Sequence, residues 1–272
     1  MIFGVSWFSY VFHASIFNFL ISVSTFYTLY KFKLNINYCF FYSLLVAVLA
    51  YPSSGTPYVD HHASILSIIS IFCFILALKT NLRIYWFLMP ILLLTSFLTK
   101  QTPTGHFLFV IVFLSLLYFI FNFDIKKIIY GFLGSVTIIL FFLIIGLISN
   151  ISLTAFLDQY ILFPLSIGKI RFDHFLFPLE FSRIFLRFKL IHLSTLIFLI
   201  ISIKNIKNNY RYLKNNEFFI SLALISSSYA LIIHQLMTIN GMFIFFIIPI
   251  LTGFSHIYFL KYYKNKKYIL SM

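Results

Sequence analysis

The sequence predicts an all-α fold, a polytopic integral membrane bundle of about nine transmembrane helices with interfacial helices in residues 150–187. Hydrophobic residues make up 61% of the 272 residues and charged residues only 10%, whereas a soluble domain has about 25% charged residues. The apolar residues also form long continuous runs, which disfavours a β-barrel because its strands alternate over about 10 residues. We therefore expect one multi-pass membrane domain over residues 1–272.

The spans follow from the length of the apolar runs. A helix needs about 20 mainly apolar residues to cross a bilayer, and helices are expected because backbone polar groups find no other partner in lipid. The second and fourth candidates are short, which bilayer thinning or burial within a bundle tolerates. The candidate spans are residues 5–30, 38–51, 62–78, 84–99, 105–122, 127–149, 188–203, 217–235 and 241–260.

The basic residues predict the orientation of the chain. Connections rich in Lys and Arg alternate with poor ones, and residues 52–61 and 236–240 contain neither. Because basic loops stay cytoplasmic, the N-terminus is expected outside and the C-terminus inside a cell (plasma or inner) membrane. The same scatter of basic clusters accounts for the net charge of +14, so we predict no nucleic-acid partner.

Residues 150–187 form a long segment on the predicted outer side. Glu180, Arg183 and Arg187 are three and four residues apart, which places them on one helical face opposite several Phe residues. This is the pattern of a helix that lies in the membrane interface. The arginines, with Arg171, suit bidentate phosphate binding or, alternatively, contact with lipid head groups.

Asp60, His61 and His62 lie where the third span begins. A carboxylate beside two imidazoles suits a divalent cation or a general base. Alternatively, Asp60 caps a helix that begins near His61. The two histidines point about 100° apart on a helix, which disfavours a shared ion. No metal or cofactor is therefore predicted, and a divalent cation remains an alternative ligand.

Lys100 and Gln101 lie where the fifth span begins. Thr102 can cap a helix whose first residue is Pro103, and the exposed amides of that helix beside Lys100 form an anion site. Lys100 is the only basic residue on the short outer loops, where topology disfavours it. Lys100 is therefore interpreted equally well as a ligand of a phosphate group or as a lysine that extends its side chain to the membrane interface. His234 and Gln235 end a later span and are interpreted as structural.

The two outer motifs together resemble the membrane module of the GT-C superfamily of glycosyltransferases. Asp60 opens an apolar helix, a basic turn follows at Lys79–Arg83, and Leu98-Thr99-Lys100 precedes a later helix. The chain is similar in this respect to the protein mannosyltransferase-like and lipid A aminoarabinose transferase-like families. The resemblance covers about residues 5–122.

This resemblance implies a transferase that moves a sugar from a polyprenyl-phosphate donor to an envelope acceptor on the outer face. Lys100 would contact the donor phosphate, and Asp60 would line the site, where glycosyl transfer needs a carboxylate. The candidate catalytic residue is Asp60, and the candidate substrate-binding residues are His61, His62, Lys100, Gln101, Arg183 and Arg187.

One part of the family pattern is missing. In these families a first transmembrane helix, and an outer loop with the acidic residue taken to be the base, precede the matched part. The present chain begins at what resembles the family's second helix. We therefore expect it to be truncated or incomplete as a transferase.

Other functions remain open from the sequence. A transporter or flippase of a lipid-linked saccharide would need a polar lining through mid-membrane, of which the sequence shows little. A non-catalytic membrane subunit would tolerate replacement of Asp60 and Lys100. An O-antigen-polymerase-like enzyme would place Arg and His residues in a long outer loop, as in residues 150–187. The expected partners are membrane lipid and a polyprenyl-phosphate-linked sugar, and the oligomeric state is not predicted.

Overall fold

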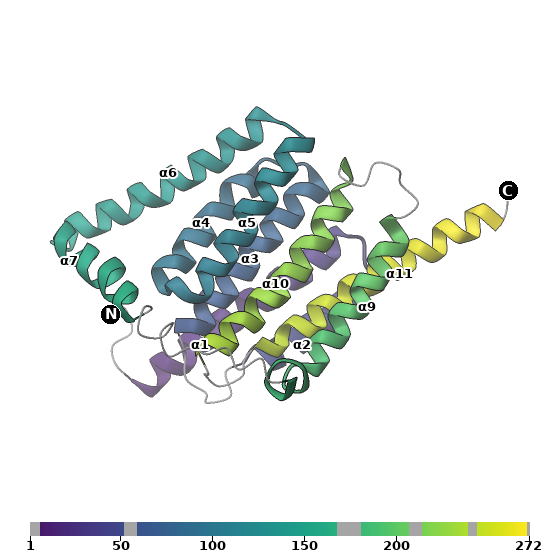
Figure 1. The fold of residues 1–272 in the computed structure, drawn as a ribbon, viewed down its shortest axis with the longest axis horizontal. Coiled ribbons are helices and arrows are strands. Elements are labelled where there is room, and N and C mark those ends of the chain that lie inside the picture. The colour runs from purple at the N-terminus through teal and green to yellow at the C-terminus, as the bar shows by residue number, and fades with distance from the viewer. Residues whose placement is uncertain (1–5, 52–58, 168–180, 207–213, 239–243, 271–272) are drawn as a thin grey trace.

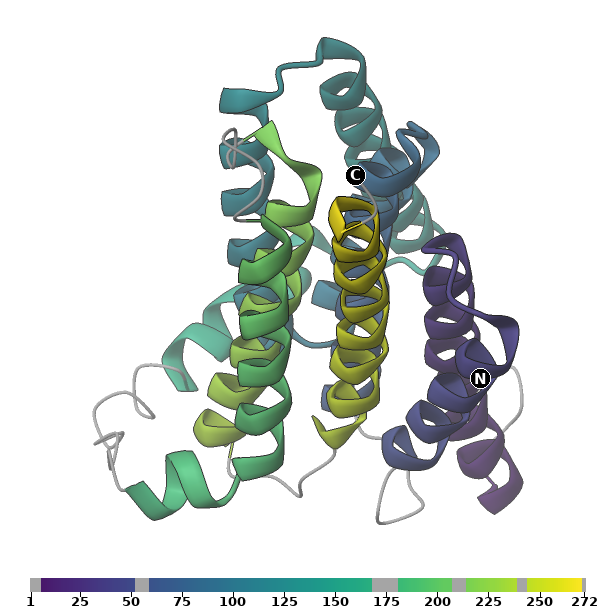
Figure 2. The ribbon, with the colours of Figure 1, turned by 90° about the vertical axis from the view of Figure 1, so that its right-hand side faces the viewer.

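The computed structural model describes the chain except for residues 1–5, 52–58, 168–180, 207–213, 239–243 and 271–272. The described part is helical and contains no β-strand. Its long helices pack side by side (Figures 1 and 2). The elements are α1 (Trp7–Lys31), α2 (Ile36–Ala50), α3 (Val59–Thr80), α4 (Ile84–Thr99), α5 (Gln101–Phe121), α6 (Ile125–Ile148), α7 (Leu153–Leu157), the π-helical turns η1 (Asp158–Leu162) and η2 (Ser182–Leu186), α9 (Lys189–Ile206), α10 (Asn216–Thr238), the 3-10 turn η4 (Ile244–Phe246) and α11 (Ile247–Leu270).

Helix α3 is the centre of the bundle. It contacts α1, α4, α5 and α10, and almost every side chain from Asp60 to Leu78 is buried. In its most apolar 18-residue window, 83% of the residues are buried. A helix that is hydrophobic all round suits such a position, because each of its faces meets another helix.

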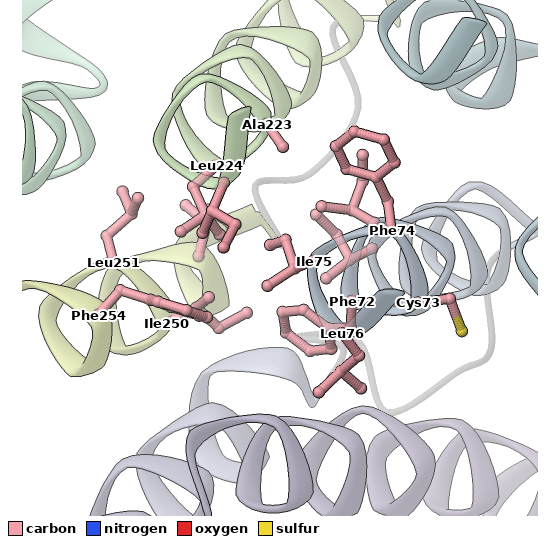
Figure 3. Packing of buried hydrophobic residues seen from close by; sticks show 14 of the residues in the cluster. Phe72, Cys73, Phe74, Ile75, Leu76, Ala223, Leu224, Ile250, Leu251 and Phe254 are labelled. Atoms are coloured by element: carbon pink, nitrogen blue, oxygen red, sulfur yellow. The ribbon is translucent and has the colours of Figure 1, made fainter. Parts of the chain in front are cut away.

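The packing around α3 joins helices that are distant in sequence. Figure 3 shows Phe72 and Ile75 of α3 near Leu224 of α10 and Ile250 and Phe254 of α11. All five side chains are almost completely buried. Close packing of this kind stabilises helix association even where the surroundings are as apolar as the helices.

Helix α6 lies at the edge of the bundle (Figure 1). Only 11% of its most apolar window is buried, and it packs against α4. A Cβ atom added to Gly134 would lie 2.1 Å from the carbonyl oxygen of Phe87 on α4. Glycine therefore permits the two backbones to approach closely, as small residues do between membrane helices.

Within the described residues, six helices are long and apolar enough to cross a membrane. Five of them are α1, α3, α5, α6 and α10, and the sixth is the helical stretch Ile244–Tyr263. Helices occur at all nine predicted segments, but α2 and α4 are shorter and α9 is not among the six, so nine spans are not confirmed. The fold is compatible with a multi-pass membrane protein, and its orientation stays a prediction.

The described parts of residues 150–187 are also helical. Helix α7, η1 and η2 contain no buried residue, and α7 lies at one end of α6 (Figure 1). Of the predicted amphipathic face, Arg183 and Arg187 are described, whereas Glu180 and Arg171 lie outside the described residues. Helical structure here agrees with the prediction, and its place in a membrane interface stays a prediction.

Candidate functional site

An ion pair lies at the end of the bundle where α3 begins and where α4 is followed by α5. The Nζ atom of Lys100 donates to Oδ2 of Asp60 at 3.0 Å, although the two residues are 40 positions apart. Asp60 is in the first turn of α3, where the positive end of the helix dipole stabilises a carboxylate. Lys100 has an extended backbone between α4 and α5. The fold therefore places the two predicted residues in contact.

The local role of Asp60 differs from the predicted helix cap. A capping residue has a non-helical backbone and turns its side chain back to the amides of its own helix. Helix α3 begins at Val59, so Asp60 is already helical. Its side chain contacts Lys100 and His234 on neighbouring elements instead.

His234 is the residue of this site that the sequence interpretation missed. It lies near the end of α10, its side chain is completely buried, and its Nε2 atom is 3.4 Å from Oδ1 of Asp60. When protonated, a histidine near a helix C-terminus is stabilised by the helix dipole. The sequence feature that could have indicated His234 is its position at the end of a span on the predicted outer side, where Asp60 and Lys100 are also expected. The carboxylate of Asp60 thus lies between an ammonium and an imidazole.

A network of hydroxyl groups lies beside the ion pair and joins α3, α4 and α5. The Oγ atom of Ser96 donates to the carbonyl oxygen of Ala63 at 2.7 Å and lies 2.9 Å from Oγ of Ser67. It also lies 2.7 Å from Oγ1 of Thr104, which is 2.9 Å from the carbonyl oxygen of Lys100. Buried hydrogen bonds of this kind hold membrane helices together. The hydrogen bonds of Ser96 and Thr104 therefore hold the backbone at Lys100 in place.

His61 and His62 face other helices. Nε2 of His61 hydrogen-bonds with the carbonyl oxygen of Ala50 at the end of α2. The ring of His62 stacks on Phe17 of α1, with 3.9 Å between centroids, and meets His13 edge-on at 4.7 Å. The two histidines therefore attach the start of α3 to α2 and α1. Among the described residues, no three His, Cys, Asp or Glu side chains are grouped to hold a metal ion.

Gln101 connects the site to the long segment that follows α6. Its Nε2 atom donates to the carbonyl oxygen of Tyr160 in η1 at 3.0 Å. Arg183 lies in η2, Arg187 follows it, and η2 packs against α9. The ion pair brings Asp60 and Lys100 together, and the convergence of the arginines on them stays a prediction.

Exposure decides which member of the site can meet a ligand. The side chain of Asp60 is 6% exposed and that of Lys100 is 32% exposed. A molecule at the surface of the bundle would therefore meet the ammonium first. A partly exposed lysine can bind an anion, and a carboxylate behind it can accept a proton. The arrangement suits a negatively charged ligand whose reaction needs a base.

Comparison of the chain with protein-family models, curated proteins and solved structures found no match. The resemblance to the GT-C superfamily therefore rests on the sequence motifs at Asp60 and Lys100.

Proposed function

We propose that the chain is a multi-pass membrane protein in which Asp60, Lys100 and His234 form the site of a sugar transferase. The donor is a polyprenyl-phosphate-linked sugar, and the acceptor is an envelope molecule on the outer face. The observation that supports this proposal best is the ion pair at 3.0 Å. It joins two residues that the GT-C resemblance assigns to one site.

In this proposal the donor phosphate competes with Asp60 for Lys100. When the partly exposed ammonium turns to the phosphate, the buried carboxylate loses a cationic partner and becomes a stronger base. Asp60 then takes the proton of an acceptor hydroxyl, whose oxygen forms a bond to the anomeric carbon of the sugar. The bond between that carbon and the phosphate oxygen breaks. Lys100 stabilises the departing polyprenyl phosphate.

His234 acts as a positioning residue. Its imidazole lies beside Oδ1 of Asp60, while Lys100 pairs with Oδ2. When Lys100 leaves, the imidazole keeps the carboxylate in place. Support of this kind is what a catalytic group needs to hold its geometry.

The competing transporter function has less support. A transporter of charged substrates is expected to place ionisable side chains along the middle of its helices. Helices α3, α5 and α10 meet at the site through their ends. Their central turns contain no Asp, Glu, Lys or Arg. A non-catalytic membrane subunit remains as an outcome of the experiment.

The experiment compares phosphate-dependent binding in matched variants. The purified chain in detergent is incubated with a polyprenyl monophosphate or with the uncharged polyprenol, and bound lipid is measured by native mass spectrometry. A charge-assisted contact contributes about 1.5–3 kcal/mol, so Lys100→Gln should weaken binding of the phosphate form roughly tenfold or more. Lys100→Arg should retain most binding. The control, Lys126→Gln, removes an exposed lysine of α6 and should bind as the parent does.

A second measurement tests the reaction. With a polyprenyl-phosphate-linked hexose as donor, Asp60→Asn should retain the donor and lose transfer. Transfer that survives both Asp60→Asn and Lys100→Gln would refute the roles proposed for these residues, and a parent chain that transfers no sugar would be a non-catalytic subunit instead.

A further inference from the structure

A pocket lies at the other end of α3, remote from Asp60. Leu78 and Lys79 at the end of α3, with Lys214 and Glu217 near the start of α10, line a cavity of about 520 Å³. At about 1.5 Å per residue, Asp60 and Lys79 lie about 30 Å apart along the helix axis. The pocket is therefore a separate feature of the molecule.

The charges around this pocket are mainly positive. Lys79 and Lys214 line it, and Lys261 forms an ion pair with Glu217. Lys33 and Lys261 are also close enough to interact electrostatically with Lys79. In the described part of this region, Lys79, Lys214 and Lys261 thus lie in or beside the pocket, and its carboxylate, Glu217, is already paired with Lys261. The Nζ atom of Lys79 lies 4.9 Å from the centre of the Phe32 ring.

One hydrogen bond between helices and one local hydrogen bond lie in the wall of the pocket. Nδ2 of Asn216 donates to the carbonyl oxygen of Leu78 at 2.7 Å and so ties the start of α10 to the end of α3. The amide of Glu217 donates to Oδ1 of Asn215 at 3.0 Å. Lys79 and Lys214 therefore lie in an open pocket whose wall includes a hydrogen bond between α3 and α10.

We propose that this pocket binds the phosphate group of an anionic ligand, for which the headgroup of a membrane lipid is the expected source. Helices α3 and α10 are both long and apolar enough to cross a bilayer, and their adjoining ends form the pocket. That position corresponds to the level of lipid headgroups. Clustered lysines at this level attract anionic lipids. The proposal is independent of any sugar transfer at Asp60.

The test uses the purified full chain with phosphatidylglycerol or zwitterionic phosphatidylcholine as probes, and retention of each lipid is measured by native mass spectrometry. We expect preferential retention of phosphatidylglycerol. Lys79→Gln and Lys214→Gln should each weaken it roughly fivefold, the usual effect of one lysine near an anionic headgroup. Lys126→Gln removes the same charge from α6 and should change retention less than about twofold.

A further arm separates the two sources of phosphate. Inorganic phosphate is added at constant ionic strength against a chloride control. Displacement of phosphatidylglycerol by phosphate assigns the pocket to the free anion, and retention assigns it to the lipid. Equal binding of the two lipids would overturn the proposal, as would an equal loss in all three variants. Unfolding temperatures of the variants separate a lost contact from a lost fold.

Discussion

Removal of the Lys100 cation should destabilise the protein through the buried carboxylate of Asp60. Breaking a fully buried pair costs about 3–5 kcal/mol, whereas an exposed pair contributes about 0.2–1 kcal/mol. The Asp60 side chain is 6% exposed, the Lys100 side chain is 32% exposed, and His234 remains beside the carboxylate. We therefore expect Lys100→Gln to lower the free energy of unfolding by about 2 kcal/mol, a value between the two limits.

A double-mutant cycle with Asp60→Asn tests this explanation, because that substitution removes the carboxylate that Lys100→Gln leaves without its cation. Asp60→Asn alone should cost about 1 kcal/mol, because Lys100 can turn to water. In the double variant no carboxylate is left without its cation, so the cost should be at least about 1 kcal/mol smaller than the sum of the two single costs.

The free energies can be measured by titrating purified protein in mixed micelles with dodecyl sulfate. Lys126→Gln serves as the control and should lie near the parent. If the two single costs add within about 0.3–0.5 kcal/mol in the double variant, Asp60 and Lys100 are not coupled. Loss of the Lys100 cation would then not destabilise the protein through the carboxylate of Asp60.

Two further predictions concern helix packing and orientation. Gly134→Ala should lower the free energy of unfolding by about 1–3 kcal/mol, because its Cβ would overlap the carbonyl oxygen of Phe87. Gly146→Ala, where a Cβ meets nothing within 4 Å, should be neutral or stabilise by up to about 1 kcal/mol, and equal losses at both glycines would contradict close packing as the cause. For the orientation, a membrane-impermeant maleimide should label Ser152→Cys in intact cells and Leu82→Cys only after permeabilisation. The native cysteines Cys39 and Cys73 are buried, and the opposite labelling pattern would place the N-terminus inside.

The positions of the helices could be predicted because the length of an apolar run is a local property of the sequence. Residues 62–78 were predicted as a span and form the body of α3, and residues 105–122 correspond to α5. The contact between Asp60 and Lys100 was expected from the motif resemblance, which relates residues 40 positions apart. The first prediction depends on local sequence alone, and the second depends on the family pattern.

The neighbours of each helix could not be predicted from hydropathy. Helix α6 has the higher mean hydropathy, 2.6, with 11% of its window buried, whereas α3 has 2.1 with 83% buried. Lipid and protein core are equally apolar surroundings, so an apolar side chain suits either. For the same reason the sequence did not indicate that α10 packs on α3 and brings His234 to Asp60. Long-range packing decided that part of the site.

The order in which the site residues occur along the chain affects how the site is completed during synthesis. Asp60 and Lys100 belong to the first half of the chain, and the elements that position them, α3 to α5, contact one another directly. His234 is on α10, which is made much later and packs against both α3 and α5. A nascent chain can therefore pair the carboxylate with lysine first, and the imidazole joins only when α10 docks. Contact between His234 and Asp60 thus marks the stage at which the bundle around α3 has closed.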